Sequence, residues 1–221
     1  KPSSCKKCAL YGAGTGFVPV LDIKGSSELV VGDIPDEDEV KANTPFANGA
    51  GSWLNGMFGA ARLDRKKICF ANVMCCKPPS EQVDKEVAEY CWRTHIEPFI
   101  RSKRWSRIWA LGEKALGKLT GRSGITLWRG SPLPVSWDGS RSVCIPTLHP
   151  AALMRQATYT SVCIRDLRKH PQPPPEYYNL YPSLAEVAAF DAKQFAFDFE
   201  WDMWTGEVTL CGLSDRLYHA I

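Results

Sequence analysis

Four cysteines stand where thiolates could share one metal centre. Cys5 and Cys8 form a C-x2-C pair near the start of the chain, and Cys91 lies fifteen residues after Cys76. Four thiolates accept either Zn²⁺ or an iron–sulfur cluster, so the residue types alone leave both open. Structural zinc sites more often consist of two short pairs, which the wide second spacing does not match. Cysteines that bind no metal at all are the third alternative.

Three polar side chains of other types each follow a short apolar run. Asp33 follows residues 29–31, Asn72 follows 68–71 and His149 follows 142–147. These runs, with a fourth at 108–111, indicate buried strands that alternate with helical patterns, which predicts a mainly parallel sheet covered on both faces. In such sheets ligands bind beyond the carboxyl ends of the strands. We therefore expect the three side chains to meet at one sheet edge.

Charge divides the chain unevenly. Residues 1–170 contain 25 Lys and Arg against 16 Asp and Glu, whereas residues 171–221 contain 2 against 8. The basic part suits a polyanion, although scattered solubilising charge is the alternative. The basic run at 101–107 could contact phosphates or form a solvated helix end. A composition of 44% hydrophobic and 23% charged residues excludes a disordered chain or a fibre.

The chain organisation indicates two domains and no membrane span. Residues 169–183 contain three consecutive prolines, which favour an extended polyproline II spacer between residues 1–168 and 184–221. In the second part, strands at 195–201 and 208–213 predict a β-hairpin. No apolar run approaches the roughly 18–20 residues of a membrane-spanning helix, and no signal peptide is visible. Because the first residue is Lys1, we expect a piece of a longer polypeptide.

Four motifs in order resemble the family 4 uracil-DNA glycosylases, the iron–sulfur branch of the uracil glycosylase superfamily, over roughly residues 3–168. They are Gly32-Asp33-Ile34-Pro35 with Pro45-Phe46, Asn72-Val73-Met74-Cys75-Cys76-Lys77-Pro78-Pro79, Arg129-Gly130, and Pro146-Thr147-Leu148-His149-Pro150-Ala151-Ala152-Leu153-Met154-Arg155. The resemblance implies a three-layer α/β/α fold with a short central sheet. It also implies a [4Fe-4S] cluster held by Cys5, Cys8, Cys76 and Cys91, with Cys76 selected over Cys75.

The same resemblance implies an enzyme that removes uracil from DNA and leaves an abasic site. Such an enzyme flips the nucleotide into a pocket. Phe46 would stack on the flipped base and Asn72 would read its N3–H and O4, with Ile34 as a further uracil-binding residue. His149 would stabilise negative charge at O2, and Asp33 would act on the water or the sugar. Leu153 and Arg155 would contact the DNA in the family's manner.

Departures from the family motif motivate a second hypothesis. Asp33 replaces the usual Glu, Asp36 and Asn48 replace usual glycines, and Ile34 stands where small or acidic residues are common. The alternative is therefore a non-catalytic uracil-DNA-binding module that recruits or stalls an attached polymerase. A zinc-stapled DNA-binding module is a third possibility. Glu39 remains a candidate pocket residue. Residues 77–90 contain no histidine, which disfavours the superfamily branch that bonds covalently to DNA.

The second part carries a weaker resemblance. Phe197-Asp198-Phe199-Glu200-Trp201 resembles the first motif of DEDD-type 3′–5′ exonucleases, as in family A DNA polymerases. Asp198 and Glu200 would then be two ligands of an incomplete Mg²⁺ site; an edge strand with exposed acids is the alternative. The two resemblances together imply a monomer continuous with polymerase and exonuclease domains, acting on uracil-containing DNA in the cytoplasm of a bacterial or phage-infected cell.

Overall fold

A computed structural model of the chain describes residues 1–13, 15–80, 83–169, 177–178, 183–189, 196–201, 208–214 and 219–220, with the backbone alone for 177–178 and from 196 onward. The chain divides into two compact units, Lys1–Pro171 and Gln172–Ile221. Most of the predicted spacer at 169–183 lies outside the described residues. The assignment of domains at 1–168 and 184–221 stays a prediction.

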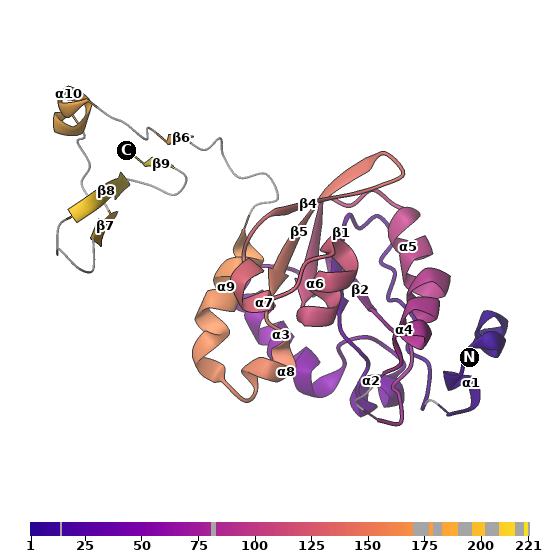
Figure 1. Cartoon of the computed structure of the whole chain (residues 1–221). Coiled ribbons are helices and arrows are strands. Elements are labelled where there is room, and N and C mark those ends of the chain that lie inside the picture. The colour runs from indigo at the N-terminus through magenta and orange to yellow at the C-terminus, as the bar shows by residue number, and fades with distance from the viewer. Residues whose placement is uncertain are drawn as a thin grey trace. The chain divides into compact units, whose positions relative to one another are not determined.

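Five strands form the central sheet of the first unit, in the order β2-β1-β3-β5-β4 (Figure 1). They are β1 (Glu28–Gly32), β2 (Cys69–Asn72), β3 (Arg107–Leu111), β4 (Leu133–Trp137) and β5 (Ser140–Thr147). The pairs β1–β2, β1–β3 and β3–β5 are parallel, and β4 runs antiparallel to β5. The prediction of a mainly parallel sheet is confirmed.

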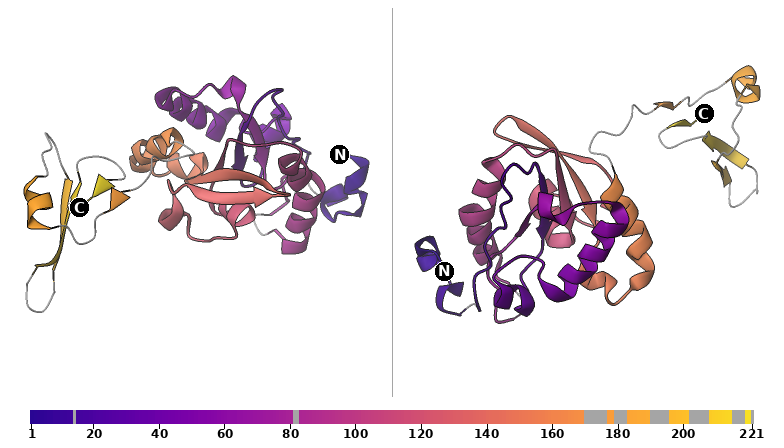
Figure 2. Two further views of the ribbon diagram at one scale, coloured as in Figure 1. Left: turned by 90° about the horizontal axis from the view of Figure 1, so that it is seen from above. Right: turned by 180° about the vertical axis from the view of Figure 1, so that it is seen from behind.

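Helices cover both faces of this sheet, which confirms the three-layer arrangement (Figure 2). Successive strand residues point to opposite faces, so Leu29 and Val31 belong to one buried cluster and Val30 to the other. The first cluster packs under α4 (Lys85–Cys91), η3 (Trp92–Ile96), α5 (Glu97–Arg101) and α6 (Glu113–Thr120). The second packs under α3 (Asn48–Ala61), α8 (Pro150–Leu153) and α9 (Thr160–Arg168).

Short helical segments complete the first unit. They are η1 (Ser3–Lys7), α1 (Leu10–Ala13), α2 (Glu37–Ala42), η2 (Arg65–Lys67), α7 (Ile125–Trp128) and η4 (Ala157–Tyr159). Among the described residues, no helix is long and apolar enough to cross a membrane.

The sequence analysis missed β4. This strand reaches β5 through Asp138 and Gly139, both of which have positive φ, 47° and 80°. Two such residues form the type I′ turn of tight hairpins, for which Asp-Gly is a preferred sequence. The signal was therefore present between Trp137 and Ser140, but the short alternating run before it was not recognised as a strand.

The second unit contains the predicted hairpin. β7 (Ala196–Trp201) pairs antiparallel with β8 (Val208–Ser214), while β6 (Tyr177–Tyr178) pairs with β9 (His219–Ala220). A short helix, α10 (Leu184–Ala188), begins with a capping box between Ser183 and Glu186. Asp198 and Glu200 belong to β7, but their side chains lie outside the described residues, so the Mg²⁺ site stays a prediction.

Candidate active site

The predicted polar residues meet at the carboxyl edge of the sheet. Asn72 is the last residue of β2 and pairs in register with Gly32, the last residue of β1. Asp33 follows directly, and His149 lies two residues beyond the end of β5. The chain leaves β1 toward β2 and returns on the other side of β1 as β3, so β1 and β3 flank the switch point at which α/β sheets bind ligands.

Phe46 is held in an unusual backbone conformation. Its φ is 54°, in the left-handed region that non-glycine residues rarely adopt. Its N–H donates to Glu39 Oε1 at 2.6 Å, and its carbonyl accepts from Arg65 Nη2 at 3.0 Å. A Cβ on Gly51 would lie 1.7 Å from that carbonyl oxygen, so only glycine fits there. Hydrogen bonds at both ends of the residue thus offset the backbone strain.

The side chain of Asn72 is oriented by the same carboxylate. Its Nδ2 donates to Glu39 Oε1 at 3.0 Å, which leaves one N–H and the Oδ1 acceptor for a ligand. A Cβ on Gly32 would lie 2.4 Å from Asn72 Oδ1 and 2.5 Å from the Phe46 ring. The amide and the aromatic ring therefore converge over Gly32, and any larger residue there would push them apart.

Glu39 joins the aromatic ring and the amide into one assembly. The residue is 6% exposed, and its second oxygen, Oε2, accepts from Asp36 N at 2.8 Å as part of the capping box of α2. Burial raises the pKa of Glu39, while the N–H of Phe46 and the amide of Asn72 oppose that shift. The capping-box spacing from Asp36 to Glu39 is visible in the sequence, but its link to the pocket is not.

His149 is a neutral hydrogen-bond donor in this site. Burial, together with the charge of Arg155, lowers its pKa to about 4. Its Nδ1 accepts from Ala151 N at 3.2 Å at the start of α8, so the proton of the neutral ring belongs on Nε2. The ring stacks against Phe46 with centroids 5.8 Å apart and planes 29° apart. The imidazole is thereby fixed in both tautomer and orientation.

Asp33 caps a helix at this edge. Its Oδ1 accepts from Ala115 N at 3.0 Å, at the N-terminus of α6, whose own N-cap, Gly112, has no side chain to do so. Gly112 has a φ of 98°, and a Cβ there would lie 2.6 Å from Asp33 Oδ2. Burial raises the pKa of Asp33, and the N–H of Ala115 and the charge of Lys114 oppose this. The carboxylate is therefore tied to the helix rather than freely mobile.

The four predicted cysteine ligands line one cavity, next to the start of the chain. Cys5, Cys8, Cys76 and Cys91 share this cavity with neighbours that include Tyr90 and His95. Burial raises the pKa of the Cys76 thiol to about 11; Lys1 opposes the shift, and the three other cysteines add to it.

Backbone pairing brings the N-terminal segment to this cavity. Val18 N donates to Cys75 O at 2.6 Å, and Leu21 exchanges two backbone hydrogen bonds with Phe70. The segment after the C-x2-C pair thus runs alongside β2 and the loop that carries Cys76. These long-range contacts place the two halves of the ligand set together.

Comparison with known proteins assigns the chain. Residues 19–168 match the uracil DNA glycosylase superfamily. The chain belongs to this superfamily. The match covers more than half of the sequence and confirms the predicted enzyme class, a uracil-DNA glycosylase.

Similar proteins carry the name type-4 uracil-DNA glycosylase. That of Sulfurisphaera tokodaii is 27% identical over 172 residues, which span 75% of this chain and 78% of the relative. That of Thermotoga maritima is 25% identical over 167 residues, spanning 75% and 86%. That of Pyrobaculum aerophilum is 27% identical over 172 residues, spanning 74% and 86%. Each similarity extends over most of both chains.

The chemistry of this glycosylase's cysteines fits a cluster better than a single zinc ion. Zinc lies about 2.3 Å from each sulfur, so a zinc site would bring the sulfurs to roughly 3.8 Å from one another. Among the described residues, no three His, Cys, Asp or Glu are grouped closely enough to hold one metal ion. Four thiols around a shared cavity are the donor set that an iron–sulfur cluster takes.

The loop after His149 carries both predicted DNA contacts. Leu153 is completely buried in the cluster beneath α3 and α9, so it would have to leave the core to contact DNA, and this contact stays a prediction. The next residue, Met154, is 52% exposed and is the apolar side chain that the loop presents. Arg155 is exposed, as a DNA contact requires, and its charge reaches His149.

Ile34 lies beside the site rather than with the aromatic ring. It packs against the cluster on the α6 face, whereas Phe46 belongs to the cluster on the opposite face. It also lines an open groove with Pro35, Lys77 and Lys114 among others. Its predicted contact with uracil stays a prediction.

Arg129 and Asp166 form an ion pair that contacts the end of the strand before His149. The sequence analysis did not identify this pair. Asp166 is 2% exposed and accepts from Arg129 Nη2 at 2.7 Å and from Thr147 Oγ1 at 2.8 Å. Thr147 is the last residue of β5, so the pair anchors the point at which the loop that carries His149 begins. A Cβ on Gly130 would meet Asp166 Oδ1 at 2.4 Å, which accounts for the Arg-Gly sequence.

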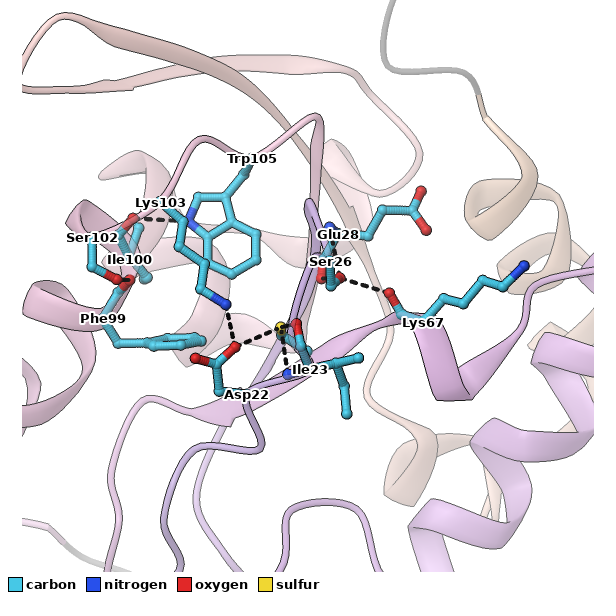
Figure 3. A network of polar contacts seen from close by, with 11 residues as sticks. Asp22, Ile23, Ser26, Glu28, Lys67, Phe99, Ile100, Ser102, Lys103 and Trp105 are labelled. Carbon is cyan, nitrogen blue, oxygen red and sulfur yellow. Dashed lines mark hydrogen bonds and ion pairs between the residues drawn. The ribbon is translucent and has the colours of Figure 1, made fainter.

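The basic run at 101–107 lies away from this edge. It leads into the N-terminal end of β3, at the edge opposite the site. Lys103 pairs with Asp22 and lies over the rings of Phe99 and Trp105 (Figure 3). Arg101 pairs with Glu97 and Asp138, and Arg107 pairs with Glu28. Three of its four cations are thus already neutralised, which disfavours the phosphate-binding interpretation.

Proposed function

We propose that this chain is a family 4 uracil-DNA glycosylase that flips uracil out of DNA and hydrolyses its N-glycosidic bond. The observation that carries the proposal is the assembly of Phe46, Asn72 and His149 at the carboxyl edge of the sheet. Glu39 joins Phe46 to Asn72, and the His149 ring stacks against Phe46. The names of the similar proteins support the assignment to family 4. The product would be DNA with an abasic site.

The aromatic ring and the amide at this edge suit uracil in stacking and in hydrogen bonding. A flipped base that stacks on the Phe46 ring gains about 1–3 kcal/mol. Asn72, with its Nδ2 partly engaged by Glu39, offers Oδ1 to the N3–H of uracil and its second N–H to O4. Cytosine presents an acceptor at N3 and a donor at position 4, so it would leave both groups of the amide unpaired.

His149 would act on the charge that develops as the bond breaks. Electron density moves from the glycosidic bond into the uracil ring, and Nε2–H of a neutral histidine can donate to O2. Preorganised donors of this kind contribute about 10²–10³-fold in rate. Because the pKa of His149 lies at about 4, the ring remains a neutral donor at physiological pH.

Asp33 would orient the attacking water or stabilise the positively charged sugar. It would do so from a fixed position. Its carboxylate is held at the N-terminus of α6 by Ala115 N. A fixed negative charge near the sugar favours an oxocarbenium-like transition state. As the C1′–N1 bond breaks, uracil would leave with the bonding electron pair; as the new C1′–O bond forms, the attacking water would lose its proton to solvent.

The proposed cofactor is a [4Fe-4S] cluster held by Cys5, Cys8, Cys76 and Cys91. When bound, it would supply a rigid cross-link rather than chemistry at the base. The cysteines come from η1, the segment after it, the loop after β2 and the end of α4. Their shared ligation would fix the N-terminal segment beside the loop that continues from Asn72.

One observation favours the second candidate, a uracil-binding module without catalytic activity. Asp33 is shorter than the family's Glu and already caps α6, so its reach toward the sugar is reduced. The fusion to an exonuclease and polymerase, the monomeric state and the cytoplasmic location stay predictions.

A uracil-containing oligonucleotide with an alkali-cleavage readout distinguishes the two candidates. We expect strand scission with the intact protein, and a loss of about 10²–10³-fold in the cleavage rate for His149→Ala with little change in binding. Arg104→Ala, at the opposite sheet edge, is the matched control and should cleave normally. Uracil-specific binding without scission would favour the non-catalytic module.

A further inference from the structure

His95 lies in the cavity that the four cysteines share. Its Nε2 atom is 3.1 Å from Cys5 Sγ, and its side chain lines the cavity with all four thiols. We propose that His95 donates an N–H···S hydrogen bond to the Cys5 thiolate and thereby raises the reduction potential of the iron–sulfur cluster. This inference rests on the cluster included in the proposed function.

Helical spacing places His95 on the side of the cluster. It follows Cys91 by four residues, about one helical turn, so the two side chains project in the same direction. It belongs to η3 (Trp92–Ile96), a π-helical turn that begins directly after Cys91. Such turns widen a helix locally and are frequent at functional sites. One short segment thus supplies both a cluster ligand and a hydrogen-bond donor to another ligand.

The ring of His95 is held in place by packing. Phe17 contacts it edge to face, with centroids 5.3 Å apart and planes at 73°. A thiolate has only acceptor capacity, so the tautomer that satisfies the contact carries its proton on Nε2. The donor is therefore oriented before the cluster binds.

A hydrogen bond to a ligand sulfur changes the energies of the two cluster oxidation states unequally. The reduced cluster carries one more negative charge, and a donor at the sulfur stabilises it more than the oxidised form. Hydrogen bonds to the sulfurs are among the factors that set the potentials of iron–sulfur proteins. Removal of the His95 donor should therefore make the cluster harder to reduce.

Protein-film voltammetry on the purified, cluster-loaded protein measures this effect directly. We expect His95→Leu to shift the equilibrium between the two oxidation states about tenfold toward the oxidised form, a potential about 59 mV more negative for one electron. His95→Gln keeps an N–H donor of similar reach and should restore most of the potential. If His95→Leu does not retain its cluster, His95→Asn provides the second variant, because its shorter amide cannot reach Cys5.

A control variant in the same cavity separates the hydrogen bond from a general disturbance of the site. Tyr90→Phe removes a hydroxyl that donates to Ser4 O at 2.7 Å. It should leave the potential close to that of the unchanged protein. Equal potentials for His95→Leu and the unchanged protein, or an equal shift in Tyr90→Phe, would overturn the inference alone. If the protein contains no iron and no sulfide after anaerobic purification, that result would overturn the proposed cluster as well.

Discussion

His149 and Glu39 illustrate how single residues acquire their properties from their surroundings. A histidine would ordinarily titrate near pH 6.5, yet burial and the charge of Arg155 lower the pKa of His149 to about 4. A glutamate would ordinarily be solvated, yet Glu39 is buried and accepts hydrogen bonds from three groups. In both cases the protein defines a donor or an acceptor in advance, so that little reorganisation is needed during the reaction.

The protonation state of His149 can be measured. Its imidazole nitrogen shifts should report the Nε2–H tautomer and remain constant as the pH is lowered from about 8 to about 5. The folded pKa lies below the unfolded one, so the unfolded chain binds a proton that the folded chain excludes. His149 therefore stabilises the fold above about pH 6.5, and this contribution is lost as the pH falls toward 4. Titration of the ring near pH 6.5 would contradict the buried, neutral assignment.

Arg65 is a positioning residue for Phe46. Its Nη2 donates to the carbonyls of Pro45 and Phe46, and its guanidinium lies 4.3 Å from the centroid of the Phe70 ring. Because Phe46 is in the left-handed region, we expect Arg65→Met to let its backbone relax and displace the ring. A displacement of about 1 Å can cost about 10²-fold in rate. The single-turnover cleavage rate of Arg65→Met should fall by up to about 10²-fold, and that of Arg65→Lys should fall less. An unchanged rate in Arg65→Met would refute the positioning role.

At the scale of elements, the site depends on how strands end and helices begin. Asn72 ends β2, Asp33 follows β1 and caps α6, and His149 caps α8. Each functional side chain therefore also satisfies, or lies next to, backbone groups that a helix or strand terminus leaves unpaired. This double role adds backbone hydrogen bonds to the side-chain contacts that orient these residues.

The loop that includes α8 yields a test of two adjacent residues. Met154→Ala should weaken binding to double-stranded uracil DNA by about tenfold, because an apolar wedge compensates part of the few kcal/mol of unstacking. It should leave stability unchanged. Leu153→Ala should instead lower the free energy of unfolding by about 2–5 kcal/mol, as for other buried leucines. Duplex binding assays and urea unfolding measure the two effects, and the reverse pattern would restore Leu153 as the DNA contact.

At the scale of the whole molecule, the core and the site both lie in the unit Lys1–Pro171. The two buried clusters draw their residues from this unit, and so do the proposed cluster ligands. The excess of Lys and Arg over Asp and Glu also lies in residues 1–170. The residues that carry the proposed glycosylase activity therefore all belong to the first unit.

A chain that ends after residue 171 should keep its activity. We expect a melting temperature and a uracil-cleavage rate close to those of the full chain, because the buried clusters and the site are retained. A chain that ends after residue 153 removes α9, whose Cys163 and Leu167 are completely buried, and should not fold. Thermal melts and the cleavage assay check both. Loss of activity on truncation after 171 would show that the second unit contributes to the site.

The sequence by itself predicted the four parallel strands of the sheet, the order of the motifs and the candidate site residues, whose roles stay predictions. Apolar runs predict buried strands from local composition, and parallel topology then brings Asp33, Asn72 and His149 to one edge. Only the tertiary structure decided that Leu153 is buried, that the basic run lies at the opposite edge, and that His95 meets Cys5. These properties depend on contacts between segments that are far apart in the chain. The spacing of residues along the sequence does not show which side chains from such segments pack against one another.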